Sequence, residues 1–217
     1  MSALDVPGWS KDARPWFDFI LPRVPAGGVY LEVGTFLGQS LAYVGHKRPD
    51  LRLVAVDPWS DEPSDLASGW DGGGDELAPL IRKHGGLYQA FLATMREHAP
   101  DVLTRTELVR ATADGYPSKD GDPPWPINWS ALLSGLHSDP ADLLFIDGRH
   151  TYEHGKKDLA TFATLVRPGG ITSGHDYRPG FFDGLVRAVD EYAAATGKTL
   201  SLGTPDGQAS TVWWTDR

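Results

Sequence analysis

The sequence lacks several residues and patterns on which common functions depend. It has no cysteine among its 217 residues, which excludes disulfides, thiolate nucleophiles and cysteine-ligated zinc or iron–sulfur sites. Any bound metal must therefore rely mainly on Asp, Glu or His. Basic residues are also scarce, because 20 Lys and Arg stand against 29 Asp and Glu, giving a net charge of −9. Phosphate backbones require clustered positive charge, so we expect no nucleic-acid partner.

Long apolar segments and targeting signals are also missing. No stretch approaches the ~20 apolar residues that are needed to span a bilayer. Residues 1–15 lack the basic and then apolar layout of a signal peptide. We therefore expect a cytoplasmic protein with no membrane partner. The composition, 41% hydrophobic and 23% charged, is typical of a globular protein, and the sequence leaves homo-oligomerisation open.

Short apolar runs alternate with helix-like segments along most of the chain. We expect strands at 28–33, 51–56, 107–111, 143–146 and 170–173. Helices are expected at 39–46, 75–98, 152–166 and 181–195, the second of them broken at Pro79 and at Gly85-Gly86. This alternation predicts an α/β protein with a doubly wound, mostly parallel sheet. Two last strands, 199–202 and 210–215, flank a turn and predict a C-terminal antiparallel β-hairpin.

Two loop-like segments interrupt this pattern. We expect one domain over residues 1–217, with insertions at about 58–75 and 114–129. Long loops in compact domains are usually functional or disordered. The second insertion contains tryptophan and tyrosine, and we interpret it as a lid or substrate wall over the carboxyl ends of the strands, where open α/β sheets bind ligands. Substrate specificity is expected to lie in these two segments.

The first predicted strand leads into a glycine-containing turn at residues 32–38. Gly34 and Gly38 allow a tight turn and the close approach of a ligand to the backbone. The dinucleotide pattern fails because Phe36 and Gln39 stand at its later glycine positions, and a phosphate-binding Walker loop fails because no lysine follows Gly38. The turn therefore suits a nucleoside ligand without a pyrophosphate, and an ordinary structural turn is the alternative.

Asp57 ends the second predicted strand and strengthens the nucleoside interpretation. A carboxylate at this place can accept hydrogen bonds from both ribose hydroxyls, whereas a helix cap is the alternative role. For Trp59, stacking on adenine and packing in the core are equally compatible with the sequence.

Acidic and histidine side chains follow the next two predicted strands. Asp147 follows one, and His175 and Asp176 follow the other, so they should converge at one edge of a parallel sheet. The three could hold a divalent cation such as Mg²⁺, which would lower the pKa of a bound substrate hydroxyl. His150 lies three residues past Asp147 and is the predicted general base, although a lone histidine is more often structural.

Residues 32–38, Asp57 and residues 142–148 together resemble the successive motifs of class I S-adenosylmethionine (SAM)-dependent methyltransferases, over about residues 29–192. The resemblance implies a Rossmann-like fold and SAM as cofactor. It also implies that the methionine part lies at Gly34, the ribose at Asp57 and the adenine by residues 111–113. The predicted cofactor contacts are Glu32, Gly34, Thr35, Phe36, Gly38, Ser40, Asp57, Trp59 and Ala113.

The segments around Asp147 and Asp176 resemble metal-dependent O-methyltransferases, above all the bacterial branch of sugar and macrolide methyltransferases and cephalosporin hydroxylase-like proteins. This implies methyl transfer to a hydroxyl of a small molecule such as a sugar or a glycosylated natural product. His150 and Asp147 are the implied catalytic residues, and Asp147, His175 and Asp176 the metal ligands. His175 stands where those enzymes have an acidic or amide ligand, and as a softer ligand it could instead be a second base.

Three alternatives stay open at this point. They are a metal-independent N-methyltransferase on the same fold, a nicotinamide-dependent oxidoreductase and a non-catalytic nucleoside-binding protein. The sequence identifies neither the acceptor nor the atom that is methylated.

Overall fold

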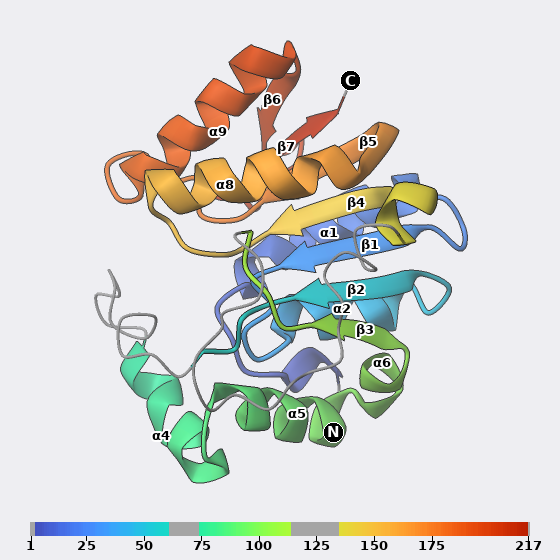
Figure 1. Ribbon diagram of the computed structural model, residues 1–217, viewed down its shortest axis with the longest axis vertical. Helices are drawn as coiled ribbons and strands as arrows, with labels where there is room; N and C mark the ends of the chain where they lie inside the picture. The colour runs from blue at the N-terminus through green and yellow to red at the C-terminus, as the bar shows by residue number, and fades with distance from the viewer. Residues whose placement is uncertain (1–2, 61–73, 114–134, 217) are drawn as a thin grey trace.

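The computed structural model describes residues 3–60, 74–113 and 135–216. Within them lies a seven-stranded sheet of order β3-β2-β1-β4-β5-β7-β6 (Figure 1). The first five strands in this order are parallel, and β7 runs antiparallel between β5 and β6. Their bounds are β1 Val29–Val33, β2 Arg52–Val56, β3 Thr106–Val109, β4 Ala141–Ile146, β5 Val166–Gly174, β6 Thr199–Leu202 and β7 Trp213–Asp216. The predicted doubly wound, mostly parallel sheet with a terminal antiparallel hairpin is confirmed.

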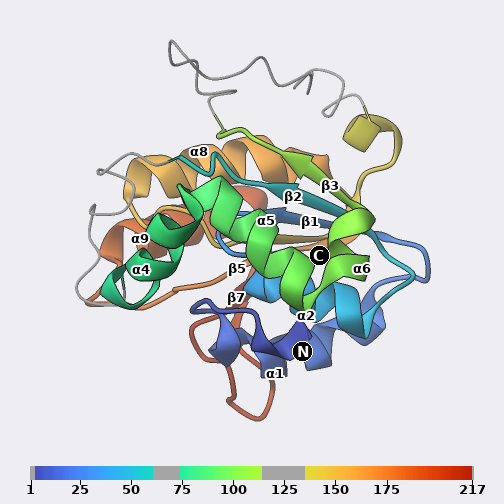
Figure 2. The same ribbon diagram turned by 90° about the horizontal axis from the view of Figure 1, so that it is seen from below.

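Helices cover both faces of the sheet, because alternate strand residues point to opposite sides (Figure 2). Val29, Leu31 and Val33 of β1 pack in one apolar core with α8 and α9, whereas Tyr30 packs in a second core with α1, α2 and α5. The bounds of these helices are α1 Arg14–Ile20, α2 Gln39–Lys47, α5 Leu87–His98, α8 Tyr152–Phe162 and α9 Asp183–Thr196, and the short α6 spans Pro100–Thr104.

Two predicted boundaries need correction. Pro79 lies inside α4 (Gly74–His84) and does not end it, since a helical proline removes only one hydrogen bond, whereas the predicted break at Gly85-Gly86 separates α4 from α5. The helical segment that begins at Tyr152 does end before the predicted stop at residues 167–170, with α8 at Phe162 and the 3-10 turn η4 over Ala163–Leu165, but β5 begins at Val166 and not at residue 170. The pairing of this earlier part of β5 with β4 includes a register shift between Ala141 and Leu143.

The segment ahead of β1, in which no helix or strand was predicted, is part of the core. It forms η1 (Ala3–Asp5), η2 (Lys11–Ala13), α1 and η3 (Leu21–Arg23). Trp16 and Phe17 of α1 are fully buried, and both rings pack against Phe145 of β4. The chain ahead of β1 therefore lies against the centre of the sheet.

Most of the two predicted insertions, at 58–75 and 114–129, falls outside the described residues. Among the helices of the described part, none combines the length and the apolar character that crossing a membrane requires.

Candidate active site

The carboxyl ends of β1, β4 and β5 lie level with one another. Val33 pairs with Ile146, and Ile146 pairs with Gly174. The pairing continues past the strands, since the N–H of Asp147 donates to the Val33 carbonyl at 2.7 Å and the N–H of His175 to the Ile146 carbonyl at 3.0 Å. The sheet order changes direction between β1 and β4, and open α/β sheets bind ligands at such a switch point. The predicted site residues therefore share one edge of the sheet.

The loop after β1 is a tight turn that depends on two glycines. Gly34 has φ 89°, and a Cβ there would lie 2.2 Å from the carbonyl oxygen of Asp147. Gly38 has φ 90° at the start of α2, and its Cβ would lie 2.6 Å from the sulfur of Met95. Larger residues are thus excluded at both positions. Phe36, between them, also has a positive φ of 51°, and its ring packs 4.6 Å from that of Trp9.

Asp57 holds this loop from the end of β2. Its carboxylate accepts hydrogen bonds from the N–H of Phe36 at 2.8 Å and the N–H of Trp59 at 2.6 Å. Burial raises the pKa of Asp57 to about 6, although these N–H groups act to lower it. The N–H of Ala111 donates to the Asp57 carbonyl at 3.2 Å, so the predicted adenine segment, with half-buried Ala113, runs beside Asp57.

Glu32 lies on the α2 side of the sheet, next to the same loop. Its fully buried carboxyl accepts a hydrogen bond from the Tyr30 hydroxyl at 2.5 Å, and the hydroxyls of Thr35 and Ser40 also interact with it. Burial raises the pKa of Glu32 to about 8; the charge of Asp147 adds to this effect and the three hydroxyls oppose it. A cationic ligand beside Glu32 would favour its ionised form.

The side chain of Trp59 corrects one predicted cofactor contact. It is fully buried, with its ring centroid 5.4 Å from that of Tyr88 and 4.7 Å from that of Phe91, and its indole N–H donates to the Phe36 carbonyl at 2.8 Å. Of the two roles that the sequence left open for Trp59, the structure shows packing in the core. A fully buried ring offers adenine no surface on which to stack.

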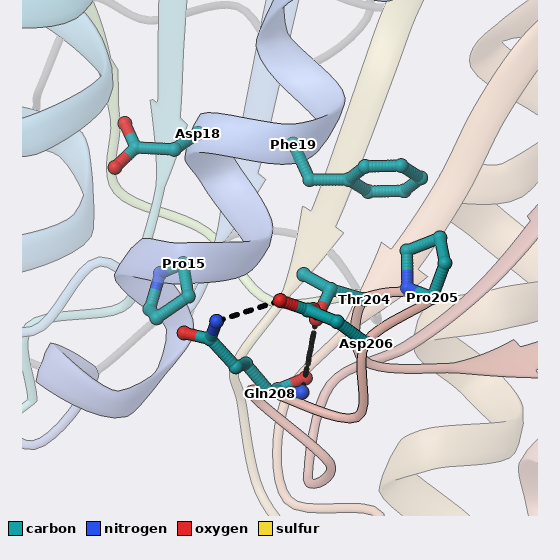
Figure 3. Close-up of a pocket in the computed structure, with 7 residues that line it drawn as sticks. All are labelled: Pro15, Asp18, Phe19, Thr204, Pro205, Asp206 and Gln208. Atoms are coloured by element: carbon teal, nitrogen blue, oxygen red, sulfur yellow. Dashed lines mark hydrogen bonds between the residues drawn. The ribbon is translucent and has the colours of Figure 1, made fainter.

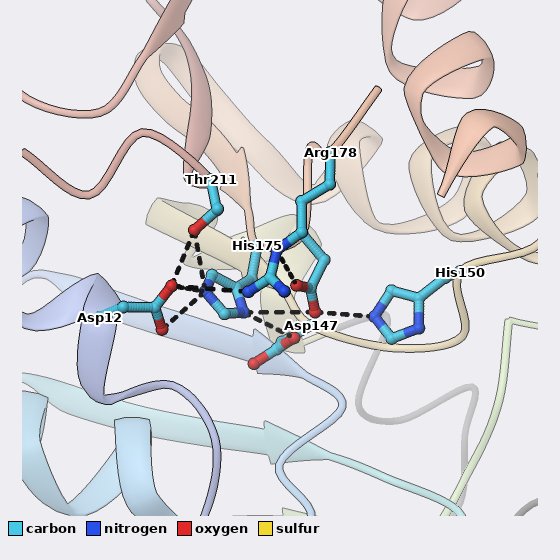
Figure 4. Close-up of polar contacts among 7 residues, drawn as sticks. Asp12, Asp147, His150, His175, Arg178 and Thr211 are labelled. Carbon is cyan, nitrogen blue, oxygen red and sulfur yellow. Dashed lines mark hydrogen bonds and ion pairs between the residues drawn. The ribbon is translucent and has the colours of Figure 1, made fainter. Parts of the chain in front are cut away.

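Asp147, His175 and Asp176 come together, as predicted. Figure 4 shows Asp147 beside His175. One donor atom from each lies within 4.8 Å of the others. Nδ1 of His175 lies 3.5 Å from Oδ1 of Asp147 and 3.4 Å from Oδ2 of Asp176. The side chain of His175 is 3% exposed, whereas those of Asp147 and Asp176 are 18% and 14% exposed. The buried imidazole of His175 thus contacts two carboxylates that are partly accessible to solvent.

His150 reaches this cluster from the loop between β4 and α8. Its Nε2 lies 2.9 Å from Oδ2 of Asp176, and its ring stacks on Phe182 with centroids 4.1 Å apart. Thr151 caps α8 by accepting a hydrogen bond from the N–H of His154 at 3.3 Å, which fixes the end of the loop. The contact with Asp176 and the stacking on Phe182 together fix the orientation of the His150 ring.

Sequence reasoning missed three residues that complete the cluster. Asp12 of η2 lies 3.1 Å from Nε2 of His175 and accepts a hydrogen bond from the hydroxyl of Thr211 at 2.9 Å. Arg178 forms an ion pair with Asp176 at 3.1 Å. Asp12 is separated from His175 by 163 positions, and no motif in the sequence links the two.

These contacts decide the charge of the buried histidine. Burial alone would lower the pKa of His175, but the carboxylates of Asp147, Asp12 and Asp176 outweigh burial and raise that pKa well above its ordinary value. The pKa of Asp176 stays below its ordinary range despite burial, because His150 and His175 donate to its carboxylate. Protonated His175 and ionised Asp176 therefore favour each other.

A separate hollow lies between α1 and the loop that joins β6 to β7 (Figure 3). Its lining residues are Pro15, Asp18, Phe19, Thr204, Pro205, Asp206 and Gln208. The Gln208 amide donates to Asp206 at 2.8 Å, so part of its polar lining is paired within the hollow. None of the predicted site residues lines it, and we place the candidate active site at the switch point.

Comparisons with solved structures agree with this architecture. The chain is similar to the O-methyltransferase NovP, at 20% identity and a TM-score of 0.57, covering 95% of this chain and 78% of that one. It is similar to CalS11, a TDP-rhamnose 3′-O-methyltransferase of calicheamicin biosynthesis, at 16% identity and a TM-score of 0.55, covering 94% and 77%. A putative caffeoyl-CoA O-methyltransferase from Staphylococcus aureus has 11% identity and a TM-score of 0.58, covering 98% and 87%. At these identities the likeness establishes the fold.

Sequence comparisons decide the family. No curated protein sequence matches the chain. The profile of a methyltransferase-domain family, however, matches residues 31–177, which run from β1 through the loop after β5 and include the glycine turn, Asp57 and the Asp147–His150–Asp176 cluster. The match covers well over half of the chain, and this protein therefore belongs to the methyltransferase-domain family, as a Rossmann-like enzyme.

Proposed function

We propose that this methyltransferase transfers the methyl group of SAM to a hydroxyl of a small molecule. The observation that carries the proposal is the pair of His150 and Asp176, 2.9 Å apart, at the same sheet edge as the glycine turn. A hydroxyl oxygen that attacks a methyl group must lose its proton, and a neutral imidazole is a suitable acceptor near neutral pH. Family membership leaves no support for the oxidoreductase or the non-catalytic alternative.

The residues of the glycine turn fit SAM. SAM carries an ammonium and a sulfonium cation, and the buried carboxyl of Glu32 is a group that a neighbouring cation would stabilise in its ionised form. Gly34 lets the turn pass directly against the backbone of Asp147, which brings the turn and the Asp147 cluster next to each other. We assign the methionine part to Gly34, with Thr35, Phe36, Gly38 and Ser40 around it, and the ribose to Asp57, with Ala113 towards the adenine. Bound SAM supplies an electrophilic methyl group.

The cluster after β4 and β5 also fits a divalent cation. Asp147 and Asp176 offer carboxylate oxygens, and Nδ1 of His175 would offer a nitrogen once the imidazole has lost the proton that its carboxylate neighbours favour; these atoms lie within 4.8 Å of one another. We propose these three as the ligand set, with Mg²⁺ as the expected cation; the nitrogen ligand would also suit a first-row transition metal. A cation there lowers the pKa of a hydroxyl that it binds.

The protein residues accept the proton and position the group that accepts it. His150 accepts the proton of the acceptor hydroxyl, and Asp176 keeps the imidazole in place and balances the positive charge that forms. Phe182 covers one face of the His150 ring, which restricts its orientation and its contact with water. Such positioning of a base against a bound substrate is a large part of catalysis in reactions of this kind.

We propose a sugar or a glycosylated natural product as the acceptor. The support is the similarity in fold to CalS11, which acts on TDP-rhamnose. The alternative within this family is a metal-independent N-methyltransferase. An amine acceptor that is neutral at assay pH needs no strong base, so turnover of amines that does not depend on His150 would favour that alternative.

A panel of hydroxyl and amine acceptors, assayed by release of S-adenosylhomocysteine, tests the proposal. His150→Ala should lower kcat on the hydroxyl acceptor by roughly 10²- to 10⁴-fold, the usual contribution of a general base. Its affinity for S-adenosylhomocysteine, measured by calorimetry, should stay at the wild-type value. His46→Ala, which changes an exposed histidine of α2, is the matched control. Wild-type turnover by His150→Ala would exclude His150 as the base.

A further inference from the structure

We propose that Asp12 is a positioning residue of the active site: it holds His175, and through His175 and Asp176 it fixes the base His150. The inference deepens the proposed function, because it rests on His150 as the base. The N-terminal segment, residues 3–20, would then contribute a positioning residue to the active site.

His175 is held between carboxylates on both sides of its ring. The imidazole is 3% exposed, and its two nitrogens face carboxylates from different parts of the chain. Nε2 lies 3.1 Å from Asp12, so Nδ1 is turned towards Asp147 and Asp176 on the other side of the ring. The Thr211 hydroxyl donates to Asp12 at 2.9 Å and lies 3.3 Å from Nε2, which holds the Asp12 carboxylate against the ring. Without Asp12, rotation of the ring would move Nδ1 away from the cluster.

The second step links His175 to the base. Oδ2 of Asp176 faces both Nδ1 of His175, at 3.4 Å, and Nε2 of His150, at 2.9 Å. Arg178 forms a parallel connection, since it lies 3.1 Å from Asp176 and 3.7 Å from Asp12. A change at Asp12 should therefore alter the orientation of His150 even though no contact between the two is found among the described residues.

The third step is the anchoring of the N-terminal segment. Trp16 and Phe17 fix α1 in the core directly after η2, which carries Asp12. The same segment contacts the glycine turn, since Trp9 packs 4.6 Å from Phe36 and the Gln39 amide donates to the Val6 carbonyl at 2.7 Å. One segment anchored in the core thus contacts both the glycine turn and the cluster around His175. This is the arrangement expected of a support that aligns a base with a cofactor.

Two substitutions of Asp12 and one control test the proposal. Asp12→Ala removes the acceptor, whereas Asp12→Asn keeps an oxygen of the same shape without the charge. We expect Asp12→Ala to lower kcat by ~10- to 100-fold, the usual effect of losing a supporting contact of this kind, with KM for SAM unchanged. Asp12→Asn should fall between Asp12→Ala and the wild type. The control is Asp18→Ala on α1, which removes a similarly exposed carboxylate that pairs with Lys47 and should leave kcat unchanged.

A second measurement separates positioning from mere structural support. The ring resonances of His150 and His175, recorded by ¹H–¹⁵N NMR with S-adenosylhomocysteine bound, should both shift in Asp12→Ala, while Asp18→Ala shifts neither. A change in kcat without a shift of His150 would overturn the proposal, as would wild-type kcat with a shift of His175 alone. If no acceptor is turned over, the proposed function fails, and the NMR arm still decides whether Asp12 positions His150.

Discussion

Glu32→Gln should change how the stability of this protein depends on pH. The pKa of Glu32 is raised from 4.5 to about 8, mainly by burial. Between these values the folded protein keeps a proton that the unfolded chain has lost, so the wild type loses stability as pH rises through this range. The slope reaches about 1.4 kcal/mol per pH unit, and the whole difference is roughly 5 kcal/mol at most. Glutamine cannot ionise, and its carbonyl can still accept the Tyr30 hydrogen bond.

Urea unfolding of both proteins without SAM, at several pH values between about 5 and 8, measures this effect. The free energy of unfolding of the wild type, relative to Glu32→Gln, should fall steadily as the pH rises, so that the variant is the more stable protein at the alkaline end. Glu97→Gln on the exposed side of α5 is the control and should follow the wild type. A wild-type-minus-Glu32→Gln difference that is independent of pH would refute the reasoning, because Glu32 would then ionise equally in both states.

Three further outcomes are expected. Gly34→Ala should lower both Tm and the affinity for S-adenosylhomocysteine, because its Cβ would lie 2.2 Å from the Asp147 carbonyl oxygen; Gly27→Ala, also at positive φ but with open space around it, should affect Tm alone. A chelator should abolish turnover and added Mg²⁺ restore it, whereas turnover that resists chelation contradicts the metal assignment. Phe181→Ala should raise KM for the acceptor, since this ring is 54% exposed and packs edge-on against Phe182, the neighbour of His150; Leu202→Ala, 46% exposed on β6, should leave KM unchanged.

Features set by local pattern were predictable from the sequence. The carboxyl ends of parallel strands lie at one edge of the sheet. Predicting the strands therefore also predicts that Gly34, Asp57, Asp147 and Asp176 lie at the same edge. The two glycines of the turn were also predictable, since both have a positive φ that favours glycine, although the contacts that exclude a Cβ at Gly34 come from the tertiary structure. The strand β6 was predicted at its observed residues.

Features set by tertiary contacts were not predictable. Trp59 follows Asp57 directly, and only the neighbouring rings of Tyr88 and Phe91 show that its side chain belongs to the core. The glycines and the proline at residues 168–170 were correctly interpreted as a helix stop, but only pairing with β4 shows that they also belong to a strand. No sequence pattern distinguishes Asp12 from other acidic residues near the N-terminus. Its role depends on the contact with His175, which only the folded structure creates.

The contacts of Asp176 limit how the metal and the base can act together. Oδ2 of Asp176 already faces His150 and His175, and Oδ1 faces Arg178. Few lone pairs of this carboxylate therefore remain for a metal ion. A cation bound by Asp176 must share these oxygens with the groups that now orient the base. Metal binding and the orientation of His150 are therefore linked through one carboxylate, and the loss of activity on chelation and in His150→Ala should not be independent. Asp12 does not take part in this competition, because it contacts His175 on Nε2, the nitrogen that faces away from Asp147 and Asp176, so a bound cation leaves this contact in place.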